Sequence, residues 1–131
     1  MSDFVEVKTQ ELSGVALDWA TAKATGAAQL KVTESGAVCC IYAMACGSGC
    51  WTAYYEPSTD WAYGGSLIEK YAVTLTPFAI SFGGAPSYWL AQPWDQRVMP
   101  LDGPTPLIAA CRAIVASVLG DTVSVPKELL S

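Results

Sequence analysis

Apolar residues at helical spacing mark the first part of the chain. The helix they predict begins after Thr9 or Ser13, either of which can cap it, and ends at about Thr25, where Gly26 supplies a left-handed stop. Its apolar stripe consists of Leu12, Val15, Trp19 and Ala22 or Lys23. Asp18 falls on the opposite side, so we expect one buried face and one solvated face.

A second helix is predicted near the other end of the chain. Thr105 can cap it, Pro106 occupies its first position and Gly120 stops it. Its core-facing stripe consists of Leu107, Ile108, Cys111, Ile114, Val115 and Val118. Arg112 is the only charge between Thr105 and Gly120, so this helix is expected to be almost enveloped by the rest of the fold.

Between these helices the residue types are those typical of β-strands. Residues 29–45 predict two strands joined near Glu34-Ser35-Gly36, residues 46–50 a glycine-rich turn, and residues 51–55 a further strand ended by Glu56-Pro57. A short helix over 66–71 and extended segments at 73–76, 78–82 and 88–91 follow. The expected fold is α+β, an antiparallel sheet covered by an N-terminal and a C-terminal helix. The 131 residues suit one domain, 1–131.

The composition is apolar for one domain. Hydrophobic residues make up 52% and charged residues 15%, against a usual charged fraction of about 25%. Residues 35–55 and 71–94 contain no charge, but glycines and prolines interrupt both, whereas a membrane-spanning helix needs about 20 mostly apolar residues. We therefore expect no membrane association and a homo-oligomer in which one strand face is covered by another subunit.

The charge balance argues against nucleic acid as a partner. Twelve acidic and seven basic residues give a net charge of −5, and the aromatic residues lack the basic groove of single-strand binding proteins. The first residues have neither the positive nor the apolar region of a secretory signal, so a cytoplasmic location is expected. Five cysteines, two of them adjacent, suit reduced thiols.

Metal and catalytic sites are not favoured. Cys46 and Cys50 flank a short turn and could form a disulfide or, with Cys39 or Cys40, a zinc site, but no histidine exists to assist. The same lack removes serine–histidine and cysteine–histidine catalysis. Asp60 could pair with one of four acids, Glu56, Glu69, Asp95 or Asp102, although no spacing places two together. No phosphate-loop or dinucleotide motif is present, and no cofactor is expected.

The central segment 58–68 is the best candidate for ligand contact. Ser58, Thr59 and Asp60 can hydrogen-bond a sugar or an amide. Trp61 and Tyr63 can stack on a planar ring, and Gly64-Gly65 at a helix start can offer N–H groups to an anion. The structural alternative is that the first three residues cap a turn, Trp61 packs in the core and the glycines allow a bend.

A second candidate segment leads into the last helix. Gly103 and Thr105 could meet a phosphate or carboxylate at the helix N-terminus, although ordinary capping explains both residues. Arg112 needs a partner if it is buried. That partner is a ligand anion or, as we expect, the carboxylate of Asp18 or Asp60 in a structural salt bridge.

Three segments, 11–20 (ELSGVALDWA), 58–65 (STDWAYGG) and 103–112 (GPTPLIAACR), together resemble the NinX-like family of small phage and prophage proteins of unknown function. The resemblance implies a phage origin and a host-cytoplasm setting. It supplies no activity to transfer, and by analogy with accessory phage proteins it suggests adjustment of host metabolism or of host defence.

The residues and the resemblance lead to one hypothesis. The chain is expected to bind, without catalysis, a small polar or nucleotide-like ligand in a hollow lined by segment 58–65 and by Gly103–Thr105. The alternative is a protein-interaction module that binds and modulates a host protein through an exposed apolar surface.

Overall fold

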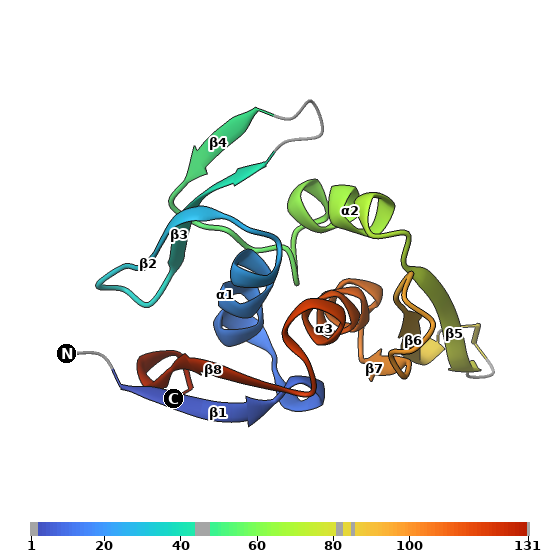
Figure 1. Cartoon of the computed structure of the whole chain (residues 1–131). Helices are drawn as coiled ribbons and strands as arrows, with labels where there is room; N and C mark the ends of the chain where they lie inside the picture. Colours follow the sequence, from blue (N-terminus) through green and yellow to red (C-terminus); the bar gives the residue numbers. More distant parts are fainter. Residues whose placement is uncertain (1–2, 44–47, 81–82, 85, 131) are drawn as a thin grey trace.

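The computed structural model describes residues 3–43, 48–80, 83–84 and 86–130. Within them the chain forms three α-helices, α1 (Gly14–Ala24), α2 (Trp61–Lys70) and α3 (Pro106–Leu119) (Figure 1). Single turns of 3-10 helix lie at Thr9–Glu11 and Lys127–Leu129. None of the helices in this described part is long and apolar enough to cross a membrane.

The strands pair only in antiparallel fashion and divide among three small sheets. The first joins β1 (Phe4–Lys8) to β8 (Thr122–Pro126). The second has the order β2 (Ala28–Val32), β3 (Val38–Ala43), β4 (Gly49–Thr52), and the third the order β5 (Thr74–Ile80), β6 (Pro86–Gln92), β7 (Leu101–Gly103). The α+β class is confirmed. The strands occupy three sheets instead of one, and β1 and β8 were not anticipated.

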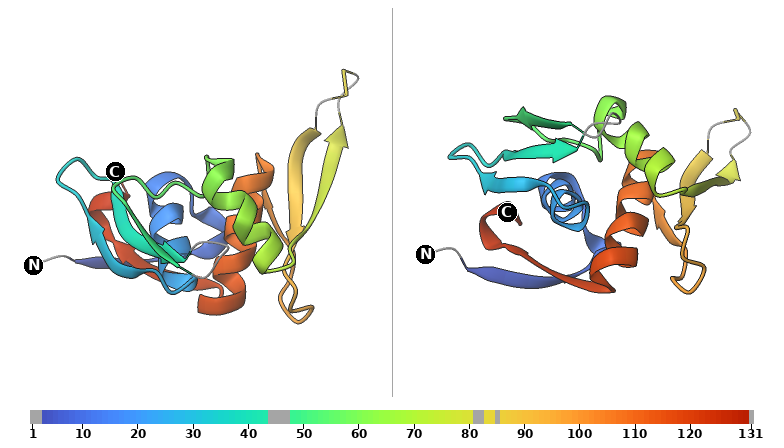
Figure 2. Two further views of the ribbon diagram at one scale, coloured as in Figure 1. Left: turned by 90° about the horizontal axis from the view of Figure 1, so that it is seen from above. Right: turned by 45° about the horizontal axis from the view of Figure 1, so that its top comes forward.

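Helix α3 lies in the middle of the molecule. One side packs on α1 through Cys111 and Val115, and the other packs on β6 through Ala109 and Ala113, which meet Ala91. Both views in Figure 2 show the β5–β6 pair beyond α3, at the opposite end from β2 and β3. The predicted cap holds, because the Ile108 N–H donates to Thr105 Oγ1 at 3.1 Å. Val118 is the exception to the predicted stripe, being half exposed.

Helix α1 is not the one-faced helix that the pattern predicted. Val15 is 39% exposed, whereas Asp18, expected on the solvated side, is 3% exposed. The cause is tertiary, because α1 is packed against α3, β2, β3 and β8 and so is buried on nearly every side. Ser13 occupies the N-cap position without a side-chain bond. Thr9 instead donates its hydroxyl to Gly120 O at 2.7 Å.

Helix α2 begins five residues earlier than predicted. Asp60 caps it, with Oδ1 accepting the Ala62 N–H at 2.9 Å. Gly64 and Gly65 therefore lie inside the helix, and the Gly64 N–H donates to Asp60 O at 2.9 Å. The prediction that these glycines offer N–H groups to an anion is wrong, because the Gly64 N–H is consumed by the helix and Gly65 lies beyond the first turn.

Other boundaries shift by a few residues. The strand predicted over 51–55 ends at Thr52, and Tyr55 is buried beyond it. The two segments predicted at 73–76 and 78–82 form one strand, β5, which continues through Pro77. Of the predicted turn at 46–50, residues 46 and 47 lie outside the described residues, so Cys46 and its possible disulfide or zinc site do too.

The contact of α2 with α3 gives a test at two neighbouring glycines. A Cβ on Gly64 would collide with Pro57 O and with Leu107 Cδ2, whereas one on Gly65 would meet only Trp61 Cε3, at 3.8 Å. We expect Gly64→Ala to lower the free energy of unfolding by about 1–3 kcal/mol through overpacking. Gly65→Ala is expected to raise it by up to about 1 kcal/mol through helix propensity.

Urea unfolding of both variants beside the wild type makes the measurement. Equal effects of the two substitutions would contradict the close packing of α2 on α3.

Candidate functional site

A hollow of about 210 Å³ lies between the N-terminal ends of α2 and α3. We call it the α2–α3 pocket. Its lining residues come from both predicted segments and from the first turn of α3: Ser58, Thr59, Trp61, Thr105, Pro106, Leu107 and Ile108. Two segments more than forty residues apart thus border one hollow.

Glycines at close contacts bring the two segments together. Gly64 lies directly against Leu107 and the Pro57 carbonyl, with no room for a Cβ. A Cβ on Gly103 would lie 2.7 Å from Ala109 N, so β7 also approaches the α3 backbone closely. These glycines act through packing, which differs from the ligand contact predicted for Gly64, Gly65 and Gly103.

The pocket lining carries no charged side chain. Hydroxyls come from Thr59 and Thr105, whereas that of Ser58 is buried behind the wall, and the residue Trp61 is 57% exposed. Pro106 at the first position of α3 has no N–H, and Thr105 caps the Ile108 N–H, which leaves the Leu107 N–H without an intrahelical acceptor. The pocket therefore offers a flat aromatic surface and hydroxyls beside the first turn of α3.

Two of the predicted site residues serve the fold instead of lining the pocket. Asp60 caps α2. Tyr63 packs edge-on against Tyr42 and Tyr55, and its hydroxyl lies 2.9 Å from Thr52 Oγ1. Sequence reasoning did not separate these roles from ligand contact because aromatic and acidic residues suit both.

Arg112 makes no salt bridge with Asp18 or Asp60, so that prediction is wrong. Its Nε donates to Leu12 O at 2.8 Å and its Nη1 to Asp102 O at 2.7 Å. Burial lowers the pKa of Arg112, and the nearby carboxylate of Asp102 raises it in part. The guanidinium thus joins α3 to the segment before α1 and to β7, and it does not line the α2–α3 pocket.

Asp18 is the residue that sequence reasoning missed. Its Oδ1 accepts the Ser58 N–H at 2.8 Å, which ties α1 to the wall of the pocket. Burial raises the pKa of Asp18 from its ordinary 3.8 to about 6; hydrogen bonding with Ser58 opposes this rise, and the charge of Glu56 adds to it. The signal in the sequence was indirect, namely an acid within a helix that is otherwise uncharged until Lys23.

Among the described residues, those that act on the Asp18 carboxyl are neutral or acidic. The Ser58 hydroxyl acts on the same carboxylate, yet its Oγ lacks the geometry of a hydrogen bond to any described residue. Burial raises the pKa of Cys111 to about 12, and the charge of Asp18 contributes. Burial likewise raises the pKa of Tyr55, which also lies near Asp18.

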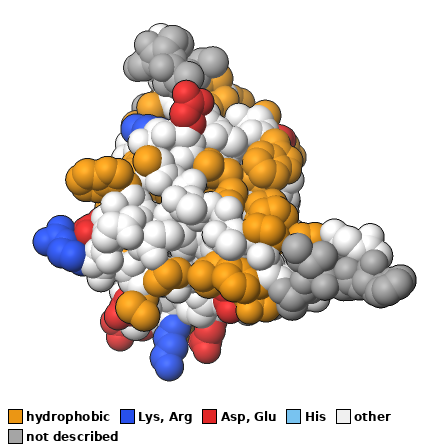
Figure 3. Space-filling view, turned by 90° about the vertical axis from the view of Figure 1, so that its right-hand side faces the viewer, with side chains coloured by type: hydrophobic (Ala, Val, Ile, Leu, Met, Phe, Trp, Pro, Cys, Tyr) orange, Lys and Arg blue, Asp and Glu red, His pale blue; other side chains and the backbone are white. Residues whose placement is uncertain are grey.

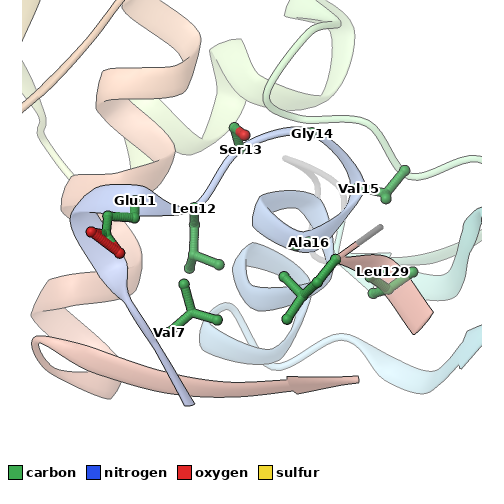
Figure 4. Close-up of a pocket in the computed structure, with 9 residues that line it drawn as sticks. Val7, Glu11, Leu12, Ser13, Gly14, Val15, Ala16 and Leu129 are labelled. Atoms are coloured by element: carbon green, nitrogen blue, oxygen red, sulfur yellow. The ribbon is translucent and has the colours of Figure 1, made fainter. Parts of the chain in front are cut away.

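A second hollow, of about 370 Å³, lies at the start of α1 (Figure 4). Its lining residues are Val7, Glu11, Leu12, Ser13, Gly14, Val15, Ala16, Leu129 and Leu130. The side chains of Val7 and Leu12 point toward one another there. Only Glu11 brings a charge, and this acid opposes anion binding at the α1 N-terminus.

The described cysteines Cys39, Cys40, Cys50 and Cys111 are free thiols. Over residues 3–43, 48–80, 83–84 and 86–130, no three cysteine, aspartate or glutamate side chains are grouped so as to hold a metal ion.

A protein-family model described as Bacteriophage P22, NinX, matches residues 8–118, a range that contains all three resembling segments. A search of curated proteins found no match.

The burial of Asp18 gives a test by pH. A carboxyl whose pKa is higher in the folded state binds more protons there, so the wild type loses stability as pH rises from about 4 to about 6. Asp18→Asn removes this titration. The variant should exceed the wild type in free energy of unfolding by up to about 3 kcal/mol above about pH 7 and match it below about pH 4.

Denaturant unfolding across this pH range makes the measurement, and Glu69→Gln, a change at an exposed acid, is the control. A wild-type stability that does not fall between these pH values would contradict the burial of an ionisable Asp18.

Proposed function

The chain belongs to the bacteriophage P22 NinX family, and from this premise we propose that this phage-encoded protein binds one uncharged, ring-containing group in the α2–α3 pocket without transforming it. The proposed setting is the host cytoplasm. The supporting observation is that two segments, both inside the matched range, border one hollow with an exposed indole, hydroxyls and no charge.

The volume of the pocket limits the size of the ligand that it can hold. Pockets for drug-sized molecules measure about 300–1,000 Å³, so 210 Å³ suits a single ring system more than a whole nucleotide. A flat heteroaromatic ring can stack on Trp61 while its polar edge meets the hydroxyl of Thr59 or Thr105.

The lack of charge in the pocket lining limits the class of ligand further. The pocket contains no basic side chain, and the guanidinium of Arg112 is engaged by the carbonyl groups of Leu12 and Asp102. A phosphate group would therefore find no cation, and the net charge of −5 would repel it. Of the nucleotide-like ligands expected from the sequence, the base or nucleoside portion fits best.

A second surface supports a role in association. The outer face of the β5–β6–β7 sheet, away from α3, carries Phe78 and Tyr88, whose rings stack with centroids 5.6 Å apart. Both are exposed, at 38% and 37%. Figure 3 shows hydrophobic side chains running across this side of the molecule, with charged ones toward its rim.

We propose that a second copy of the chain covers this outer face. Each copy carries a net charge of −5, so two copies avoid repulsion only where the contact excludes charge, and residues 71–94 contain none. Binding of a host protein at the same face is the alternative.

The ligand proposal is tested at Trp61. Nucleosides and their 5′-monophosphates are titrated by calorimetry against the wild type, Trp61→Ala and, as a matched control, Trp94→Ala, whose indole is 76% exposed outside the pocket lining. Loss of one stacking contact of about 1–3 kcal/mol should weaken nucleoside binding at least fivefold in Trp61→Ala alone. Monophosphates should bind no more tightly than nucleosides.

Failure of every nucleoside to bind, or unchanged binding by Trp61→Ala, would refute the pocket as the ligand site. Tighter binding of the monophosphates would refute the argument from charge.

The association proposal is tested at Phe78. Light scattering should give a mass of about twice the 13.8 kDa of one chain for the wild type, and of one chain for Phe78→Glu, which places a like charge on each copy. Val118→Glu, at an exposed position on α3, is the control and should leave the mass unchanged. A wild type of 13.8 kDa would contradict self-association.

A further inference from the structure

Asp18 links the first of the three resembling segments to the second. It lies inside α1, 3% exposed, and its Oδ1 holds the Ser58 N–H at 2.8 Å. Ser58 and Thr59 then form one wall of the α2–α3 pocket. The hydrogen bond therefore fixes the backbone of this wall from behind, where a ligand does not reach.

This carboxyl is an unusual group to bury. Arg112 on α3 gives its hydrogen bonds to the carbonyls of Leu12 and Asp102, and no ion pair forms at Asp18 within the described residues. The ionisable groups that act on it or feel its charge are Glu56 and Tyr55, from the segment before α2, and Cys111, from α3. None of them is a cation, so nothing nearby favours the charged form except Ser58.

Ser58 gives the second observation. Its residue is 1% exposed, and its Oγ makes no hydrogen bond within the described structure. A buried hydroxyl without a partner is uncommon, because the loss of water is then uncompensated. The hydroxyl of Ser58 can donate to the ionised carboxylate of Asp18, and the Ser58 side chain accordingly lowers the pKa of that carboxyl, which favours the ionised form.

We propose that Asp18 is a positioning residue for the pocket: its ionised carboxylate holds the Ser58–Thr59 wall in the arrangement seen here, and its protonation releases that wall. The inference rests on the proposed function for the ligand it serves. The ionised carboxylate accepts the Ser58 N–H in a charge-assisted bond. The protonated, neutral carboxyl accepts the same N–H more weakly.

The coupling has a definite sign. The wall can bind ligand only while Asp18 is ionised. Ligand binding therefore releases the proton of Asp18 to solvent, and acid weakens the binding. Since burial places the pKa of Asp18 at about 6, the change falls between about pH 5 and pH 7.

The test uses the amide signal of Ser58 in the full chain. Its ¹⁵N and ¹H shifts, followed by NMR from about pH 4.5 to 7.5, should titrate with a midpoint near 6 in the wild type and in the control Glu69→Gln. They should stay constant in Asp18→Asn. A Ser58 signal that does not move in the wild type overturns the inference, and this reading needs no variant to fold.

A second arm measures nucleoside affinity by calorimetry. We expect the wild type to bind about tenfold more weakly at about pH 5 than at about pH 7, and Asp18→Asn to show no such change. A titrating Ser58 with pH-independent binding overturns the coupling. A titrating Ser58 with no nucleoside bound at any pH supports the role of Asp18 in the wall and refutes only the proposed ligand.

Discussion

Helix α3 is covered on one side by α1 and on the other by β6, and the rest of the structure depends on this double packing. Alanines face β6, while Cys111 and Val115 face α1. Small residues allow this, because elements can approach α3 only where side chains are short. Gly64 on α2 and Gly103 on β7 extend the same principle to the backbone. The α2–α3 pocket is lined by residues at the starts of these two helices, close to the contact of Gly64 with Leu107.

The fold treats the half-buried Arg112 and the buried Asp18 differently. Arg112 donates to one carbonyl oxygen from each of two segments, and these bonds join the segments to α3. Asp18 receives one backbone N–H and faces groups that are neutral or acidic. The arrangement at Arg112 is that of a charged side chain that stabilises the fold by hydrogen bonds. The arrangement at Asp18 leaves a carboxyl with a pKa of about 6. Such a shifted pKa is more typical of a functional position than of a purely structural one.

Local signals were predicted well and nonlocal ones were not. The start and end of α3 followed from Thr105, Pro106 and Gly120, because caps depend on neighbouring residues alone. The start of α2 was missed because Asp60 precedes aromatic and glycine residues that favour a loop. The burial of Asp18 and the pairing of β1 with β8 depend on contacts between distant residues, which periodicity within one segment cannot report. The same limit applies to the site: its two segments could be chosen by residue type, whereas the separate roles of Tyr63 and Arg112 required the packing.

The pairing of β1 with β8 has a consequence for how the chain is made. The bond from Thr9 to Gly120 joins residues 111 positions apart, and the Lys127 N–H donates to Asp3 O. During translation the first strand emerges long before its partner and waits as an unpaired edge until β8 leaves the ribosome. The sheet that unites the two ends is therefore the last to close, and any nascent chain that stalls before residue 122 exposes a strand able to pair with a neighbour.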